Sequence, residues 1–147
     1  MTSTPTAFRG FTLVELSVVL AVALTTMAVA LPGFNAQVQN SRTVPALREM
    51  SMVGIQLEKS FQRDHRYGVS GKCAVPDAQV EHFSVHCSLS DDGSGYTLDA
   101  VGHGPMAGYQ YRTDEQGRQR TISHPNASNA ANGALPCWSL EGRSCGA

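Results

Sequence analysis

The sequence predicts an α+β fold, in which a long kinked N-terminal helix, transmembrane in its first half, packs against a four-stranded antiparallel sheet. Two observations carry this prediction. An apolar run that passes into an amphipathic helical stripe comes first, and short alternating segments separated by turns follow it. With 147 residues, of which 41% are hydrophobic, the chain has room for one apolar anchor and one small domain.

The apolar run covers residues 11–31, and Glu15 is its only charged residue. As a helix this run would rise about 31 Å, which is enough to cross the hydrocarbon core of a bilayer. The preceding residues 1–10 include no acidic residue and carry Arg9, so we expect this end of the helix to stay cytoplasmic.

Glu15 needs an explanation, because a carboxylate near the bilayer interior costs about 2.5–3.5 kcal/mol on insertion scales. Its position in the first turn of the helix is favourable, since the helix dipole attracts an anion there. In apolar surroundings a matched cation makes such a charge tolerable, whereas an unmatched charge is not.

Composition alone leaves two simpler interpretations of this segment open. Ala28-Val29-Ala30 offers an A-x-A-like cleavage site, so the segment could be a secretory signal peptide. In that case a disulfide-bonded binding domain would be secreted after cleavage behind Ala30. An uncleaved signal-anchor is the other interpretation. Glu15 argues against the cleaved signal peptide, because a charge has no purpose at the start of its apolar region.

After Pro32 the composition turns polar, but a helical period continues. Apolar residues recur at spacings of three and four, which indicates an amphipathic helix lying on a core. Pro45 should begin this segment or kink a longer helix. Together, residues 11–67 predict one kinked helix of about 85 Å. The apolar stripe consists of Leu47, Met50, Val53, Leu57 and Phe61.

Strand signals begin after the helix. The stretch HFSVHCSL alternates strictly between apolar and polar residues, as a half-buried strand does. Three more short segments, separated by turns rich in Asp and Gly, complete an antiparallel meander that packs on the helix stripe. We expect the Asn-, Ala- and Pro-rich stretch 123–136 to be a loop. The four predicted strands are residues 82–89, 96–101, 107–113 and 118–122.

Four cysteines lie beyond the apolar run, and an even number behind an export-type N-terminus predicts disulfides in an oxidising compartment. Three pairings are possible. We favour the sequential one, because both loops are short and close at modest entropic cost. No C-x-x-C spacing occurs, which disfavours a zinc ribbon or a thioredoxin-like site. The favoured bonds are Cys73–Cys87 and Cys137–Cys145.

The stretch GFTLVE at residues 10–15 resembles the processing and methylation signature of type IV prepilins and pseudopilins. The match is a Gly, then a Phe, then a Glu four residues after the Phe, with a long apolar run behind. This resemblance implies cleavage after Gly10 by a prepilin peptidase, methylation of the new Phe11 amine and assembly into a filament. It also implies a leader of residues 1–10, a membrane and filament-core helix of residues 11–32, and a periplasmic or extracellular domain of residues 33–147.

In such families Glu15 would face the N-terminal ammonium of a neighbouring subunit and set the register of assembly. Pro32 matches the helix-kinking proline of the family. The implied partners are other pilin subunits, the prepilin peptidase and methyltransferase, and the inner membrane. A single-pass protein of the inner membrane would become part of a cell-surface pilus.

Residues 96–120, followed by a late Cys-Trp, look like the small PilE-type minor pilins. This favours a minor pilin, with a type II secretion pseudopilin as the alternative. One departure is that major pilins usually close a single C-terminal disulfide loop, whereas four cysteines imply a second bridge here. The detailed form of the tip region is therefore not carried over.

Catalytic and metal chemistry is not expected. No nucleophile elbow and no phosphate-binding loop occurs in the sequence. His82 and His86 share a face of the first predicted strand, but about 13 Å of strand separates them, too far to bind one ion. We therefore expect no enzyme activity, no cofactor and no metal.

A DNA-uptake pilin is a weaker alternative. Three arginines and two tyrosines cluster around the last predicted hairpin, and arginine with interleaved aromatic residues can grip phosphate and stack on bases. We expect instead that the tyrosines face the core and that the arginines are solvated. The formal net charge of −1 also disfavours a bulk attraction to nucleic acid. These residues are Tyr109, Tyr111, Arg112, Arg118 and Arg120.

Overall fold

The computed structural model describes residues 10–127 and 134–145, without the side chains of residues 29–33. The chain forms two compact units, Met1–Ala36 and Gln37–Ala147. Helix α1 (Leu13–Asp64) supplies residues to both, which confirms the long N-terminal helix. It ends three residues before the expected boundary, where His65 adopts a positive φ of 54°, a conformation typical of the residue that follows a helix.

Two prolines lie within α1. Pro45 occupies an interior position, so the alternative in which it begins a separate helix is wrong. Because proline has no N–H, it leaves the carbonyl of Ser41 without its usual helix partner. The side chain of Pro32 lies outside the described residues, and the kink expected there stays a prediction.

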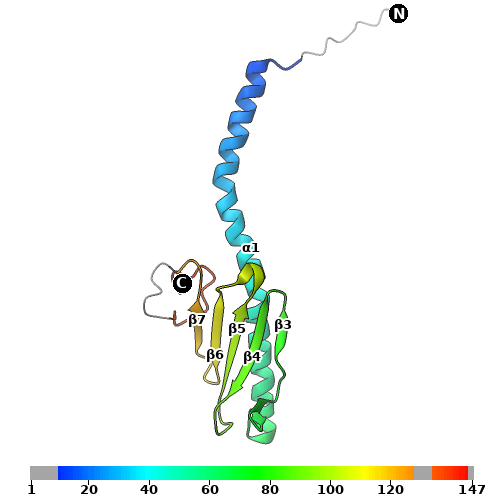
Figure 1. Cartoon of the computed structure of the whole chain (residues 1–147), viewed down its shortest axis with the longest axis vertical. Coiled ribbons are helices and arrows are strands. Elements are labelled where there is room, and N and C mark those ends of the chain that lie inside the picture. Colours follow the sequence, from blue (N-terminus) through cyan, green and yellow to red (C-terminus); the bar gives the residue numbers. More distant parts are fainter. Residues whose placement is uncertain (1–9, 128–133, 146–147) are drawn as a thin grey trace, which may run out of the picture. The chain divides into compact units, whose positions relative to one another are not determined.

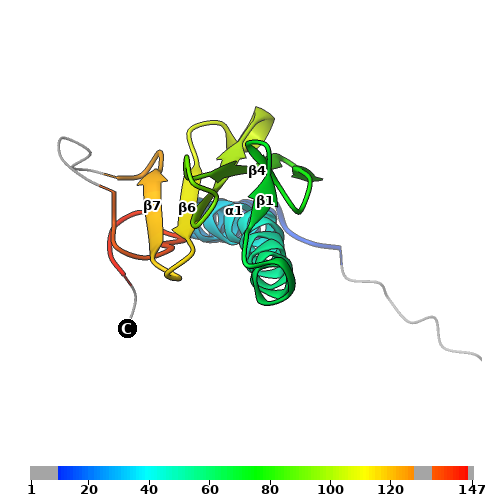
Figure 2. The ribbon, with the colours of Figure 1, turned by 90° about the horizontal axis from the view of Figure 1, so that it is seen from below.

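The second unit consists of the C-terminal part of α1 packed on an antiparallel sheet (Figures 1 and 2). Each strand pairs with its neighbour in sequence. This order confirms the α+β class and the meander, but the sheet has five strands rather than the expected four. The strands are β3 (Ala78–Val80), β4 (Phe83–Leu89), β5 (Tyr96–Gly102), β6 (Gln110–Asp114) and β7 (Gln119–Ser123).

Two local features explain where the predicted strands were wrong. The extra strand β3 is three residues long, which is too short to show a period of two. Strand β6 begins three residues later than expected, because the one-turn helix η1 (Gly104–Met106) occupies the chain before it. Pro105 starts that turn, and Gly108 has a φ of 90°, which a strand cannot include.

A small second sheet joins β1 (Gly68–Val69) to β2 (Lys72–Cys73). The two residues of its turn, Ser70 and Gly71, both have positive φ, at 56° and 75°. Positive φ at both central positions is the requirement of a type I′ hairpin turn. This hairpin follows α1 directly and was not predicted from the sequence.

The core of the second unit lies between α1 and one face of the five-stranded sheet. The predicted helix stripe is confirmed, because its central members are buried and Leu47 and Phe61 pack at its border. On the sheet side, alternate residues of β4 and β5 point into the core, as predicted for β4. The fully buried side chains include Met50, Leu57, Phe83, Val85, Leu98, Met106 and Tyr111.

An aromatic stack closes the end of the core where α1 meets β1. The ring of Tyr67 lies 4.7 Å from that of Phe61 and 4.8 Å from that of Tyr96, measured between centroids. The Tyr67 hydroxyl donates to the Glu58 carboxylate at 3.1 Å, so the buried ring keeps its polar end satisfied. Burial and the Glu58 charge raise the pKa of this hydroxyl.

The disulfides join Cys73 to Cys87 and Cys137 to Cys145, which is the sequential pairing. The first ties the small hairpin to β4. The second closes a loop in the C-terminal segment. Within this loop, the carbonyl of Cys137 accepts from Thr121 of β7, and the carbonyl of Ser139 accepts from Tyr111 of β6.

Truncating the helix stripe should destabilise the second unit strongly. Leu57 is fully buried, whereas Ile55 on the opposite face of the same helix is 52% exposed. We expect Leu57→Ala to lower the free energy of unfolding by about 3 kcal/mol, because it leaves a cavity. The matched Ile55→Ala should change it by less than about 0.5 kcal/mol. Chemical unfolding of the full chain in detergent measures both, and equal effects would contradict the packing described.

Candidate functional site

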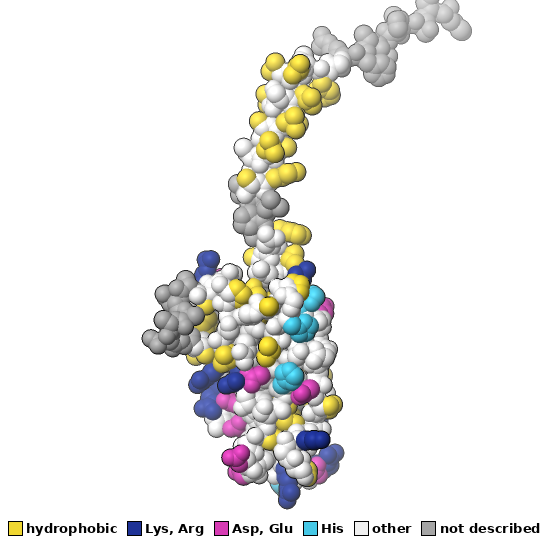
Figure 3. All heavy atoms as spheres, in the orientation of Figure 1, with side chains coloured by type: hydrophobic (Ala, Val, Ile, Leu, Met, Phe, Trp, Pro, Cys, Tyr) yellow, Lys and Arg dark blue, Asp and Glu magenta, His cyan; other side chains and the backbone are white. Residues whose placement is uncertain are grey.

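The N-terminal part of α1 exposes apolar side chains on every side. Phe11 is 87% exposed, and the large apolar residues that follow it are at least 54% exposed. Figure 3 shows them as apolar side chains along this segment. Soluble monomers rarely expose so much contiguous apolar surface, and a helix that is apolar all round is normally buried. The residues are Leu13, Val14, Leu16, Val18, Val19, Leu20, Val22, Leu24 and Met27.

The hydroxyl groups of this segment form hydrogen bonds within the helix. The Ser17 hydroxyl donates to the carbonyl of Val14 at 2.8 Å, and the hydroxyls of Thr25 and Thr26 donate to carbonyls one turn back in the helix. In apolar surroundings every polar group needs such an internal partner. The segment therefore needs no water to satisfy its described hydroxyls.

Glu15 caps the helix in which it lies. Its Oε2 atom accepts from the backbone N–H of Thr12 at 2.8 Å and from the Thr12 hydroxyl at 2.9 Å. In return, the Glu15 N–H donates to the Thr12 hydroxyl oxygen at 3.2 Å. This reciprocal arrangement is a capping box, whose signal T-x-x-E is readable in the sequence but was missed there. Only Oε2 is used, and Oε1 makes no hydrogen bond within the described part of the chain.

The predicted processing residues lie immediately before this cap. Gly10 and Phe11 are exposed and precede the first helical residue, Leu13. A Cβ added to Gly10 would meet no atom within 4 Å. The Gly10–Phe11 peptide bond thus lies outside the helix, between two exposed residues. The rest of the predicted leader, residues 1–9, lies outside the described residues.

A second apolar strip lies on α1 within the second unit. Val44, Met52 and Ile55 are 41%, 48% and 52% exposed, and they occupy the face of the helix opposite the buried stripe. The helix therefore has an outward apolar strip besides the face that packs on the sheet.

Among the described residues, no helix is sufficiently long and apolar to cross a membrane.

The histidines do not form a metal site in the described ranges. His86 pairs instead with Asp77, with 2.8 Å between Nδ1 and the carboxylate. The side-chain hydrogen bond from His86 lowers the pKa of Asp77. His65 and His103 are exposed. His124, which sequence reasoning passed over, is buried.

The tyrosines near the last hairpin face the core and the arginines lie on the surface, as expected from the sequence. Tyr109 and Tyr111 are 3% and 0% exposed, so their rings cannot stack on bases. Arg112 bonds Asp99 at 2.8 Å, and Arg118 bonds Asp114 at 2.8 Å, which neutralises both charges.

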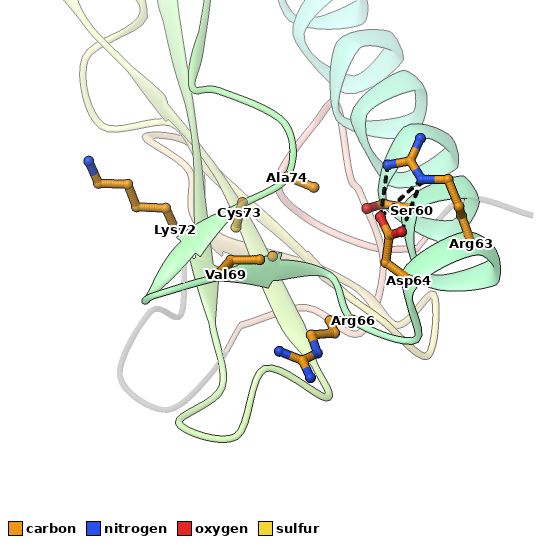
Figure 4. Close-up of a pocket in the computed structure, with 9 residues that line it drawn as sticks. Ser60, Arg63, Asp64, Arg66, Val69, Lys72, Cys73 and Ala74 are labelled. Atoms are coloured by element: carbon orange, nitrogen blue, oxygen red, sulfur yellow. Dashed lines mark hydrogen bonds and ion pairs between the residues drawn. The ribbon is translucent and has the colours of Figure 1, made fainter.

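A pocket at the C-terminal end of α1 carries further basic residues, shown in Figure 4. Arg63 is held by the adjacent Asp64. The side chains of Arg66 and Lys72 point away from each other. The cationic groups do not converge, and the pocket shows no arrangement that would grip an anion.

No protein-family model matches this chain, and no curated protein matches it. Among solved structures, the chain is similar to a type IV pilin from Shewanella oneidensis, with 20% sequence identity and a TM-score of 0.49. The match covers 69% of this chain and 98% of that one.

Proposed function

We propose that this protein is a structural subunit of a type IV pilus, a minor pilin that is inserted in the inner membrane before assembly. The observation that carries the proposal is the exposed apolar part of α1. This helix begins at Leu13, shortly after the pair Gly10-Phe11, and Glu15 caps it through Thr12. Its role is assembly through packing, and no residue is assigned to catalysis.

The exposed helix suits two apolar environments. The bilayer covers its side chains before assembly, and the helices of neighbouring subunits cover them in the filament. Transfer between the two exposes little apolar surface to water, which would cost about 25 cal/mol for each Å². The outward strip of Val44, Met52 and Ile55 supplies apolar contact on the second unit as well.

Glu15 has two tasks in this proposal. Its Oε2 caps the helix through Thr12. Its Oε1 stays available for the ammonium of Phe11 on a neighbouring subunit, once cleavage after Gly10 has created that group. The cap holds the carboxylate in one place, and a placed charge can define a register.

The alternative functions start from the same precursor structure but differ in where the mature protein is located. A type II secretion pseudopilin would use the same cap and the same exposed helix. A secreted domain released after Ala30 would lose both, and the capping box would then serve only the precursor. A DNA-uptake pilin would have to bind DNA through basic side chains alone, because Tyr109 and Tyr111 are buried and cannot stack on bases. A gel shift of the full chain with DNA at low salt tests that last alternative.

The mature N-terminus separates these classes. We expect the protein isolated from membranes to begin at Phe11 and to carry one extra methyl group, as intact mass and N-terminal sequencing will show. A mature chain that begins at residue 31 in the soluble fraction would contradict the proposal.

Substitutions of Glu15 separate its two tasks. Glu15→Gln keeps an oxygen that can accept from Thr12 but removes the charge, whereas Glu15→Ala removes both. If the charge sets the register, both variants remain in the membrane and both are absent from sheared filaments. The control Ser17→Ala, which removes a hydroxyl that bonds only its own helix, should assemble normally.

The amounts in membranes and in sheared filaments are compared by immunoblot. Normal assembly of Glu15→Gln together with failure of Glu15→Ala would show that capping alone matters, and the register role would then be wrong.

A further inference from the structure

The disulfide loop of residues 137–145 is held on strands β6 and β7 by buried hydrogen bonds; Figure 2 shows this C-terminal segment beside the two strands. The Thr121 hydroxyl donates to the carbonyl of Cys137 at 2.7 Å and accepts from the N–H of Ser139 at 2.8 Å. The Tyr111 hydroxyl donates to the carbonyl of Ser139 at 3.1 Å. These bonds fix the start of the loop.

His124, just after β7, holds the second half of the loop. The ring is 6% exposed and uses both nitrogens. Its Nε2 lies 3.0 Å from the carbonyl of Leu140, which can only accept, so Nε2 carries the proton. Its Nδ1 accepts from the backbone N–H of Asn126 at 3.1 Å, so Nδ1 carries none. The closed loop therefore requires one tautomer of the neutral ring.

The loop backbone lies directly against this ring. Gly142 has a φ of 72°, and a Cβ added there would overlap Nδ1, Cγ and Cβ of His124. On another side, the ring meets Tyr109 edge to face, with 4.5 Å between centroids. A proton added at Nδ1 would point at the N–H of Asn126, which is a donor and cannot accept it.

Within residues 10–127 and 134–145, no ion pair joins a carboxylate to His124. The titratable neighbours are Tyr109 on the chain before β6, and Glu141 and Arg143, which flank Gly142 in the loop. Both loop residues are exposed, and neither forms an ion pair with the ring among the described residues. Burial lowers the pKa of His124, and the carbonyl of Leu140 opposes this only in part.

We propose that His124 is a latch whose ring releases the loop segment 140–142 when its Nδ1 takes up a proton. The charged ring gains access to water when the backbone of Gly142 moves off it. One proton is bound for each opening. Protonation removes the acceptor of the Asn126 N–H, and opening also gives up the bond from Nε2 to the carbonyl of Leu140. The Cys137–Cys145 bond keeps the released loop closed on itself. The closed state disfavours the proton, so closure is complete above the ordinary histidine pKa of about 6.5 and weakens as the pH falls below it.

Opening uncovers the His124 ring, which lies against Tyr109. The bonds of Thr121 to Leu135, Cys137 and Ser139 keep the edge of β7 covered. This inference does not rest on the proposed pilus role, because it concerns the second unit alone.

Amide hydrogen exchange of the full chain in detergent tests the latch. Between about pH 7.5 and about pH 5, protection of the Gly142 and Asn126 amides, corrected for intrinsic exchange, should fall about tenfold relative to the β4 and β5 amides. His124→Gln keeps a donor for Leu140 and cannot titrate, so its protection should not change with pH. The exposed His103→Gln is the matched control and should behave as the wild type.

Protection that is independent of pH in the wild type, or the same fall in His124→Gln, would overturn the proposal. If His124→Gln does not fold, an NMR titration of the wild type decides. The His124 ring and the Gly142 amide must then shift with one common midpoint below the ordinary histidine pKa of about 6.5. Separate midpoints would refute the latch.

Discussion

The structure depends on one constraint: a helix that is apolar on all sides cannot remain in contact with water. From Leu13 to Met27, large apolar side chains surround the helix, and the hydroxyls of Ser17, Thr25 and Thr26 bond back to its own carbonyls. The described hydroxyls of this segment therefore need no hydrogen-bond partner outside the helix. The proposed function gives this segment two apolar surroundings, a bilayer before assembly and a bundle of helices in the filament.

The second unit is independent of this constraint, because it has its own core. The buried stripe around Met50 and Leu57 packs on β4 and β5 and leaves the outer face of α1 free. One helix thus stabilises a domain with one face and offers contact surface with the other. The Cys73–Cys87 bond and the docked loop of residues 137–145 tie down the parts of the domain that lack long strands.

Features with a long, regular signal were predictable from the sequence. The helix stripe and the alternation of β4 each extend over several turns or residues, so their periods were readable. Strand β3 and the β1–β2 hairpin were too short to show a period, and η1 displaced the start of β6 through Pro105 and Gly108. The cap formed by Thr12 and Glu15 has the sequence signal T-x-x-E, but the same carboxylate also fits an intermolecular pair, and the sequence does not separate the two roles. His124 could not be found, because its burial depends on a loop that lies 16 residues further along the chain.

Photocrosslinking from opposite sides of the apolar helix tests the central claim most directly. A photoreactive residue at Leu16 and, separately, at Val18 probes two faces that are each 57% exposed in the isolated chain. The account predicts crosslinks to lipid in membranes and to neighbouring subunits in sheared filaments from both positions. Recovery of the protein in the soluble fraction without crosslinks from either position would contradict it.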